Sequence, residues 1–153
     1  RPTMSSATQT VPTSSVATRT DWFAGVRTDQ LAATVLRLTM GVLFLAHVWL
    51  KLAIFTPAGT VAFFESLGFP GILAYAVILA EGLGGIALIL GLWSRWVSLA
   101  LLPILLGAIY PHWGAGFFFS NAGGGWEFPA FWSVALIVQA LLGNGALALQ
   151  RDR

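Results

Sequence analysis

The chain has 153 residues and a mean hydropathy of +0.80; 57% of its residues are hydrophobic and only 9% are charged. This composition excludes an ordinary soluble domain, in which about 25% of residues are charged, and indicates an integral membrane protein. The absence of cysteine excludes disulfides, thiolate catalysis, iron–sulfur clusters and covalently attached c-type haem. A formal charge of +2 gives no basis for nucleic-acid binding, so the expected partner is the lipid bilayer.

The N-terminal stretch, residues 1–30, is rich in serine, threonine and alanine and has no apolar run. We interpret it as a flexible polar tail that is neither a signal peptide nor part of a packed core. Trp22 and Phe23 within it are expected to lie in the lipid headgroup layer as an interfacial anchor.

Four apolar segments follow the tail, at about 31–55, 72–93, 94–112 and 128–145. A helix needs ~20 apolar residues to cross the hydrocarbon of a bilayer. We therefore predict an all-α, four-helix membrane domain over residues 31–149. The fourth span should be the thinnest, because Gly143 and Gly145 are expected to end its helix early.

The orientation of the spans is predicted from the basic residues. Arg19, Arg27, Arg95, Arg151 and Arg153 fall on the N-terminal tail, on the connection between the second and third spans, and at the C-terminus. Basic residues gather on the cytoplasmic side of membrane proteins. We therefore expect both termini to be cytoplasmic, with residues 150–153 as a short tail, in a bacterial inner membrane.

The second span carries small residues that let helix backbones approach, namely Ala76, Ala80, Gly84 and Gly85. This helix should therefore lie at the centre of the bundle. Residues 56–71 are too short and too polar to cross the bilayer, and their apolar side chains recur at spacings of three. They predict a short interfacial helix between the first two spans.

The two connections on the outer side are rich in aromatic residues and glycine. Most of the eleven phenylalanines lie in or beside them. His112, Trp113, Trp126 and Glu127 flank a glycine run and form a candidate outer cap, and Trp132 is expected in the outer aromatic belt. Two interpretations stay open: an ordered interfacial loop, or a cap over a site for a flat apolar ligand such as a quinone.

Four ionisable residues fall within the predicted spans: Arg37, His47, Lys51 and Glu81. The first three project within roughly 80° of one another on the first span. Charged groups at this depth are costly, so they normally face the bundle interior and have a partner. Glu81, near the midplane, is the natural counter-ion, with His47 its nearest neighbour and the long side chains of Arg37 and Lys51 leaning toward it.

Two roles are compatible with this polar set. It could bind a quinone, or it could simply fasten the first span to the second. Lys51 alone could also extend toward the outer headgroups. A haem between His47 and His112 is formally possible, but two histidines are a weak signal. We therefore predict no metal site and no covalently bound cofactor.

Several stretches of the chain match a known family in order. They are "LRLTMGVLFLAHVWLKL" (36–52), "FFESLGFPG" (63–71), "AEGLGGIALILGLWSR" (80–95), "GGGWEFPAFW" (123–132) and "LLGNG" (141–145). Over residues 31–145 the chain resembles the DoxX family of small four-helix membrane proteins from bacteria and archaea. The family is named for a membrane component associated with thiosulfate:quinone oxidoreduction, and its members are linked to quinone or catechol stress and to membrane-bound oxidoreductase complexes.

The resemblance has implications for individual positions. Arg37, His47, Lys51, Glu81 and Glu127 match polar sites that recur in the family. One position departs from its pattern, because many relatives carry glycine after the histidine where this chain has valine, in "HV" (47–48).

The resulting functional hypothesis is a membrane subunit of a quinone-linked oxidoreductase or redox-stress complex. His47 and Lys51 would contact the quinone oxygens and Glu81 would relay protons. The chain has no motif for an electron-carrying cofactor, so it is expected to be an accessory subunit that receives electrons from another membrane or soluble subunit. The alternatives are a structural subunit that assembles a larger complex, and a small proton-coupled permease, which at this length would require a homo-oligomer.

Overall fold

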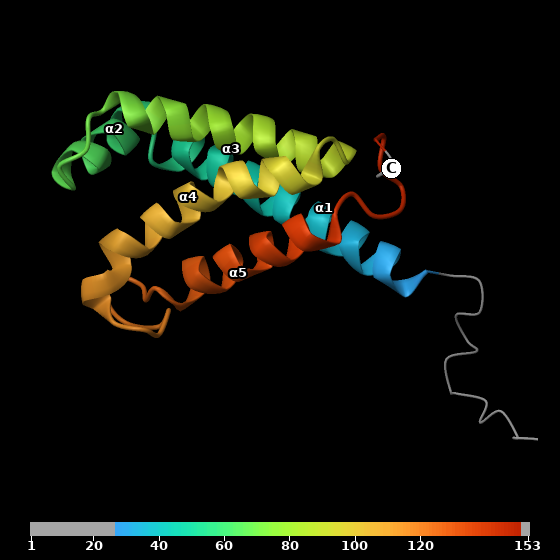
Figure 1. Ribbon diagram of the computed structural model, residues 1–153. Coiled ribbons are helices and arrows are strands. Elements are labelled where there is room, and N and C mark those ends of the chain that lie inside the picture. Colours follow the sequence, from blue (N-terminus) through green and yellow to red (C-terminus); the bar gives the residue numbers. More distant parts are fainter. Residues whose placement is uncertain (1–26, 151–153) are drawn as a thin grey trace, which may run out of the picture.

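The computed structural model describes residues 27–150 of the chain (Figure 1). Most of the predicted N-terminal tail, including the interfacial anchor at Trp22 and Phe23, lies outside the described residues, and so do residues 151–153 of the predicted C-terminal tail. The described residues contain helices and no strand, which confirms the all-α prediction.

The helices are α1 (Thr28–Trp49), η2 (Leu50–Ile54), α2 (Pro57–Ser66), α3 (Ile72–Leu90), α4 (Ser94–His112), η3 (Trp113–Ala115) and α5 (Glu127–Leu142). Three stretches are long and apolar enough to cross a membrane: Thr28–Ile54, Ile72–Leu90 and Ser94–Ala115. The fourth, α5, is apolar but has only 16 residues. At 1.5 Å per residue it is about 24 Å long.

The helix ends follow local chemistry. The predicted interfacial helix forms as α2, which begins with Pro57 and is capped by the Thr56 hydroxyl, an acceptor for the Gly59 amide at 3.2 Å. At the end of α3, Gly91 adopts a left-handed conformation with φ of 71°, and the Leu92 amide donates to the Ala87 carbonyl at 2.9 Å. This C-terminal motif ends the helix at residue 90, three residues before the expected boundary.

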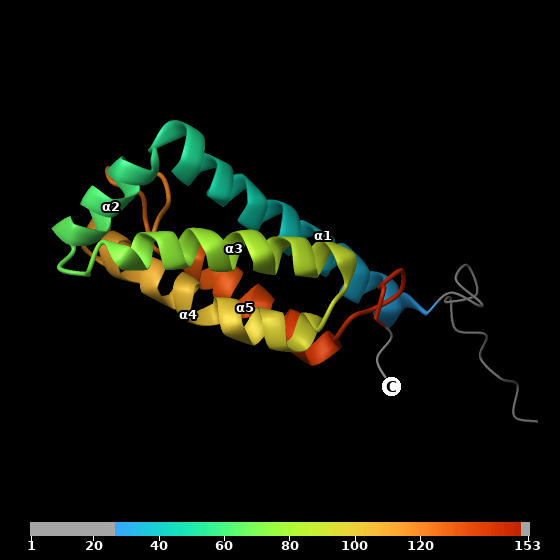
Figure 2. The same cartoon turned by 90° about the horizontal axis from the view of Figure 1, so that it is seen from above.

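Four helices lie lengthwise in the bundle, and α2 lies at one end together with the loop between α4 and α5 (Figures 1 and 2). At the opposite end, α1 begins beside the segment that follows α5. Two hydrogen bonds hold this end together: the Ala146 amide donates to the Gln30 carbonyl at 3.2 Å, and the Thr34 hydroxyl donates to the Ala146 carbonyl at 2.6 Å.

The helix α3 contacts α1, α2 and α4, whereas α5 packs mainly on α1 and α4, so the four long helices form a ring. The prediction that the second span lies at the centre of the bundle is therefore wrong, because one face of α3, with Leu79 and Leu83, points outward. Gly41 of α1 and Gly85 of α3 face each other so closely that a Cβ on Gly41 would lie 2.8 Å from the Gly85 carbonyl oxygen. On the other side of α3, Gly84 leaves room for the Leu101 side chain of α4. Small residues thus bring three helices into close packing.

The interior of the bundle is apolar and centred on Phe44, Leu88, Leu101, Trp132 and Leu136. The outward faces are apolar as well, because every long helix exposes large apolar side chains, for example Val35 on α1, Leu79 on α3, Leu106 on α4 and Leu141 on α5. A bundle that is apolar both inside and outside is suited to a lipid environment, where the outer face contacts acyl chains.

Candidate functional site

A buried ion pair joins α3 to the C-terminal end of the first span. The Lys51 ammonium Nζ lies 2.7 Å from Oε2 of Glu81, and the two side chains are 17% and 5% exposed. Glu81 sits in the middle of α3, and it is the only acidic residue of that helix. Removing one member of such a pair leaves the other charge buried without compensation, which commonly costs about 3–5 kcal/mol.

Lys51 lies in a π-helix, η2, which continues directly from α1. Its signature is the Phe55 amide, which donates to the Leu50 carbonyl five residues earlier at 2.8 Å. The Thr60 hydroxyl of α2 donates to the Lys51 carbonyl at 3.3 Å and thereby links the widened turn to the interfacial helix. Turns of this kind occur often at functional sites. The π-helix has no recognisable signal in the sequence.

His47 lies one turn before Lys51 and packs against α5. Its Nδ1 donates to the Leu43 carbonyl at 2.9 Å, so in the neutral ring Nε2 is an acceptor. Its ring meets that of Trp132 edge to face, with 4.8 Å between centroids. Residues four apart lie on one face of a helix, so His47 lies on the same side of the first span as Lys51, which bonds to Glu81, and we treat the three as one group.

Trp132 is a member of this group that the sequence analysis assigned to the outer aromatic belt. That assignment was wrong, because Trp132 is 3% exposed and packs against Phe44 and Phe128 in the core. Its indole Nε1 has no hydrogen-bond partner among the described residues. The only signal in the sequence was its place in the first turns of the fourth span.

Arg37 lies at the other end of the bundle and does not approach Glu81. Its Nη1 donates to the carbonyls of Leu88 and Ile89, both at 2.6 Å, and its Nη2 donates to the Leu147 carbonyl at 3.3 Å. The expectation that Arg37 leans toward Glu81 is therefore corrected: the carbonyls in the last turn of α3 are a nearer partner for a cation. The guanidinium is 1% exposed and closes the end of α3.

The residues of the predicted outer cap contact one another. Trp113 and Trp126 stack with 5.3 Å between centroids and 19° between ring planes. The His112 ring nitrogen Nδ1 donates to the Gly123 carbonyl at 3.0 Å, and Oε1 of Glu127 accepts from the Phe119 amide at 2.7 Å. These contacts order the loop, and none of them joins it to His47, Lys51 or Glu81. Residues 27–150 contain no group of three His, Asp or Glu side chains that could hold a metal ion.

Comparison with known proteins agrees with the motifs. The DoxX family profile matches residues 32–121. A curated Bacillus subtilis (strain 168) protein named "Putative oxidoreductase CatD" is 32% identical over 120 residues, which cover 78% of this chain and 85% of that protein. No solved structure matches. The family match spans more than half of the chain and includes Arg37, His47, Lys51 and Glu81, so the protein belongs to the DoxX family.

Proposed function

We propose that this protein is a membrane subunit of a quinone-linked oxidoreductase and that the group of His47, Lys51, Glu81 and Trp132 binds the quinone. The observation that carries the proposal is the buried Lys51–Glu81 ion pair, which lies one turn from His47, whose ring packs against Trp132; both rings have hydrogen-bonding atoms without a partner among the described residues. The related Bacillus subtilis protein, named as an oxidoreductase, supports the same class of function.

The chemistry of the group suits a quinone. A quinone is a flat apolar ring with two carbonyl oxygens, and it needs hydrogen-bond donors aimed at those oxygens. The Trp132 indole N–H is a buried donor without a partner, and the Lys51 ammonium has donors beyond the one bonded to Glu81. The His47 and Trp132 rings supply apolar walls from α1 and α5.

Reduction of a quinone to a quinol takes up two electrons and two protons. The electrons must come from a partner subunit, because the chain has no cysteine and no motif for an electron carrier. The protons would pass through Lys51 and Glu81, which share a hydrogen bond, and His47 would accept or donate a proton at Nε2. In this arrangement the chain binds and protonates the quinone, and the partner reduces it.

The test is quinone reduction in intact membranes. Glu81→Gln and His47→Ala are expected to lower the rate by about a hundredfold, in line with the contribution of a positioned acid or base. Glu65→Gln is the matched control, since it neutralises an exposed acid on α2 outside the group and should leave the rate unchanged. Unchanged rates in folded, membrane-inserted Glu81→Gln protein would refute the proposal.

A double variant separates chemistry from helix pairing. If the ion pair serves only to fasten α1 to α3, Lys51→Met with Glu81→Met should restore both the amount of folded protein and the quinone activity, because an apolar pair can replace a buried ion pair without loss. If the pair is functional, the double variant should fold but remain inactive. Restored activity would favour the alternative role as a structural subunit.

A further inference from the structure

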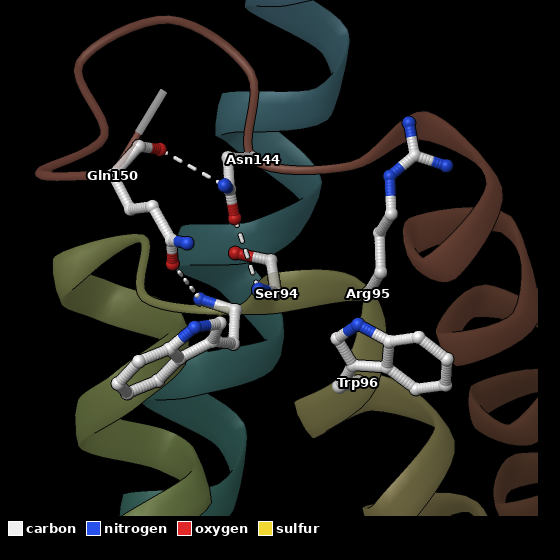
Figure 3. A pocket seen from close by; sticks show the side chains of 6 residues that line it. Ser94, Arg95, Trp96, Asn144 and Gln150 are labelled. Carbon is white, nitrogen blue, oxygen red and sulfur yellow. Dashed lines mark hydrogen bonds between the residues drawn. The ribbon is translucent and has the colours of Figure 1, made fainter. Parts of the chain in front are cut away.

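A pocket lies at the opposite end of the bundle from the group of His47, Lys51 and Glu81. It has a volume of about 90 Å³, enough for several water molecules or one small anion. Figure 3 shows its lining side chains, which come from the start of α4 and from the segment after α5. They are Trp93, Ser94, Arg95, Trp96, Asn144 and Gln150.

The amide oxygens in this pocket are already occupied by backbone N–H groups. The Trp93 amide donates to Oε1 of Gln150 at 2.8 Å, and the Ser94 amide donates to Oδ1 of Asn144 at 2.9 Å. The Nε2 group of Gln150 has no partner among the described residues and points toward the Ser94 hydroxyl in Figure 3. The side-chain amide oxygens are thus used, whereas the Gln150 amide N–H₂ and the Ser94 hydroxyl have no partner among the described residues.

Ser94 is the most informative residue of the pocket. It is 0% exposed, and its hydroxyl has no hydrogen-bond partner among the described residues. In Figure 3 the hydroxyl is directed toward the Asn144 and Gln150 side chains, on the pocket side of α4. A buried hydroxyl without a partner is costly, and it indicates a ligand that completes its hydrogen bonding.

The electrostatics of the pocket favour an anion. None of the described residues that line it is acidic, and Arg95 supplies a positive charge. Arg95 uses Nη1 for the carbonyls of Ala140 and Leu141, at 3.3 and 3.1 Å, which leaves its other guanidinium nitrogens available. The pocket also lies at the N-terminus of α4, where the free N–H groups and the helix dipole attract negative charge.

Two exposed tryptophans place the pocket at the depth of lipid headgroups. Trp93 is 61% exposed and Trp96 is 72% exposed, and both line the pocket at the end of a membrane-spanning helix. Tryptophan is enriched at this level of a membrane protein. We propose that this pocket binds a phosphate group, carried either by a lipid headgroup or by a small soluble phosphate compound, through the Ser94 hydroxyl, Arg95 and the N-terminus of α4.

The test uses the purified full-length protein in detergent, with three probes: phosphatidylglycerol, diacylglycerol, which lacks the phosphate, and inorganic phosphate. Native mass spectrometry measures lipid retention, and the melting temperature measures stabilisation by each probe. Ser94→Ala and Arg95→Gln are expected to weaken binding of the phosphate-bearing probe by about tenfold, the effect of losing one charge-assisted hydrogen bond.

Ser98→Ala is the matched control. Ser98 is also 0% exposed with an unpartnered hydroxyl, but it lies one turn further along α4 and does not line the pocket. Retention of phosphatidylglycerol but not diacylglycerol, lost in the Ser94 and Arg95 variants alone, supports a lipid phosphate. Stabilisation by inorganic phosphate alone supports a soluble ligand. Equal binding of the two lipids without any effect of phosphate, or equal losses in the Ser98 variant, would overturn the proposal.

Discussion

Arg37 and Arg95 make the same kind of contact in different surroundings. Each guanidinium donates to two consecutive carbonyls at the C-terminal end of a helix: Arg37 at Leu88 and Ile89 of α3, and Arg95 at the end of α5. Both contacts supply donors to carbonyls in the last turn of a helix, where intrahelical donors run out. Arg37, however, is buried, whereas Arg95 is exposed. The surroundings therefore determine how much each contact contributes to stability.

We expect Arg37→Met to lower the free energy of unfolding by about 3 kcal/mol, because it leaves buried carbonyls without a donor. Arg95→Met is the matched control and should cost under about 1 kcal/mol, since water can replace an exposed donor. Thermal and chemical unfolding of both variants in one detergent measures the difference. Equal losses would contradict the assignment of Arg37 as the buried cap of α3.

The site illustrates what the sequence can predict about single residues. The sequence spacing of Arg37, His47 and Lys51 places them on one face of a helix. A charged Glu81 inside the bilayer is costly without a partner, so the sequence also predicts that a cation lies beside it. The choice among the three cations depended on local backbone geometry, because the π-helix presents Lys51 to Glu81 and the open end of α3 binds Arg37. Neither feature has a signature in one sequence.

At the scale of the helices, glycine sets the spacing of α1 and α3. A Cβ on Gly41 would lie 2.6 Å from Cγ1 of Ile89 and 2.8 Å from the Gly85 carbonyl oxygen, so no side chain fits there without separating the helices. Gly107 of α4 is different, since nothing lies within 4 Å of its Cβ position. The two glycines allow a direct comparison between packing and intrinsic helix propensity.

We predict that Gly41→Ala lowers the free energy of unfolding by about 1–3 kcal/mol through overpacking. Gly107→Ala should instead raise it by about 0.5–1 kcal/mol, because alanine favours a helix where no contact opposes it. Melting temperatures of the two variants in the same detergent measure these opposite shifts. A neutral or stabilising Gly41→Ala would show that α1 and α3 can separate freely.

The helices themselves were predictable to different degrees. Long apolar runs predicted α1, α3 and α4, and apolar side chains at spacings of three predicted the short helix α2. The burial of Trp132 was not predictable from pattern, because α5 is apolar on its lipid-facing side as well as on its core side. In a soluble protein the polar face of a helix reveals its orientation, and in a membrane helix that signal is missing.

At the scale of the whole molecule, both ends of the described chain lie at one end of the bundle. Residues 30 and 146 are hydrogen-bonded to each other, and the start of α1 lies beside the segment after α5 (Figure 1). Three crossings would leave these ends on opposite sides of a membrane. We therefore expect α5 to cross as a fourth span, although its length of about 24 Å is less than the ~30 Å of a typical hydrocarbon core.

Introduced cysteines can test this topology cleanly, because the chain has none of its own. We expect Asn121→Cys to react with a membrane-impermeant maleimide in spheroplasts, since it lies in the outer loop, and Gln150→Cys to react only after the membrane is opened. The prediction rests on four crossings with the basic end in the cytoplasm. Labelling of both positions from outside would refute an even number of spans.

The π-helix at Leu50–Ile54 also has a consequence for variation in chain length. A π-turn holds about one more residue than an α-turn, so this segment contains one residue beyond what a continuous α-helix would need. A deletion of one residue after Lys51 could be absorbed by reversion to α-helix while α1 and α2 keep their places. Among related chains, we expect gaps of one residue within the first span to fall in this segment rather than between His47 and Lys51.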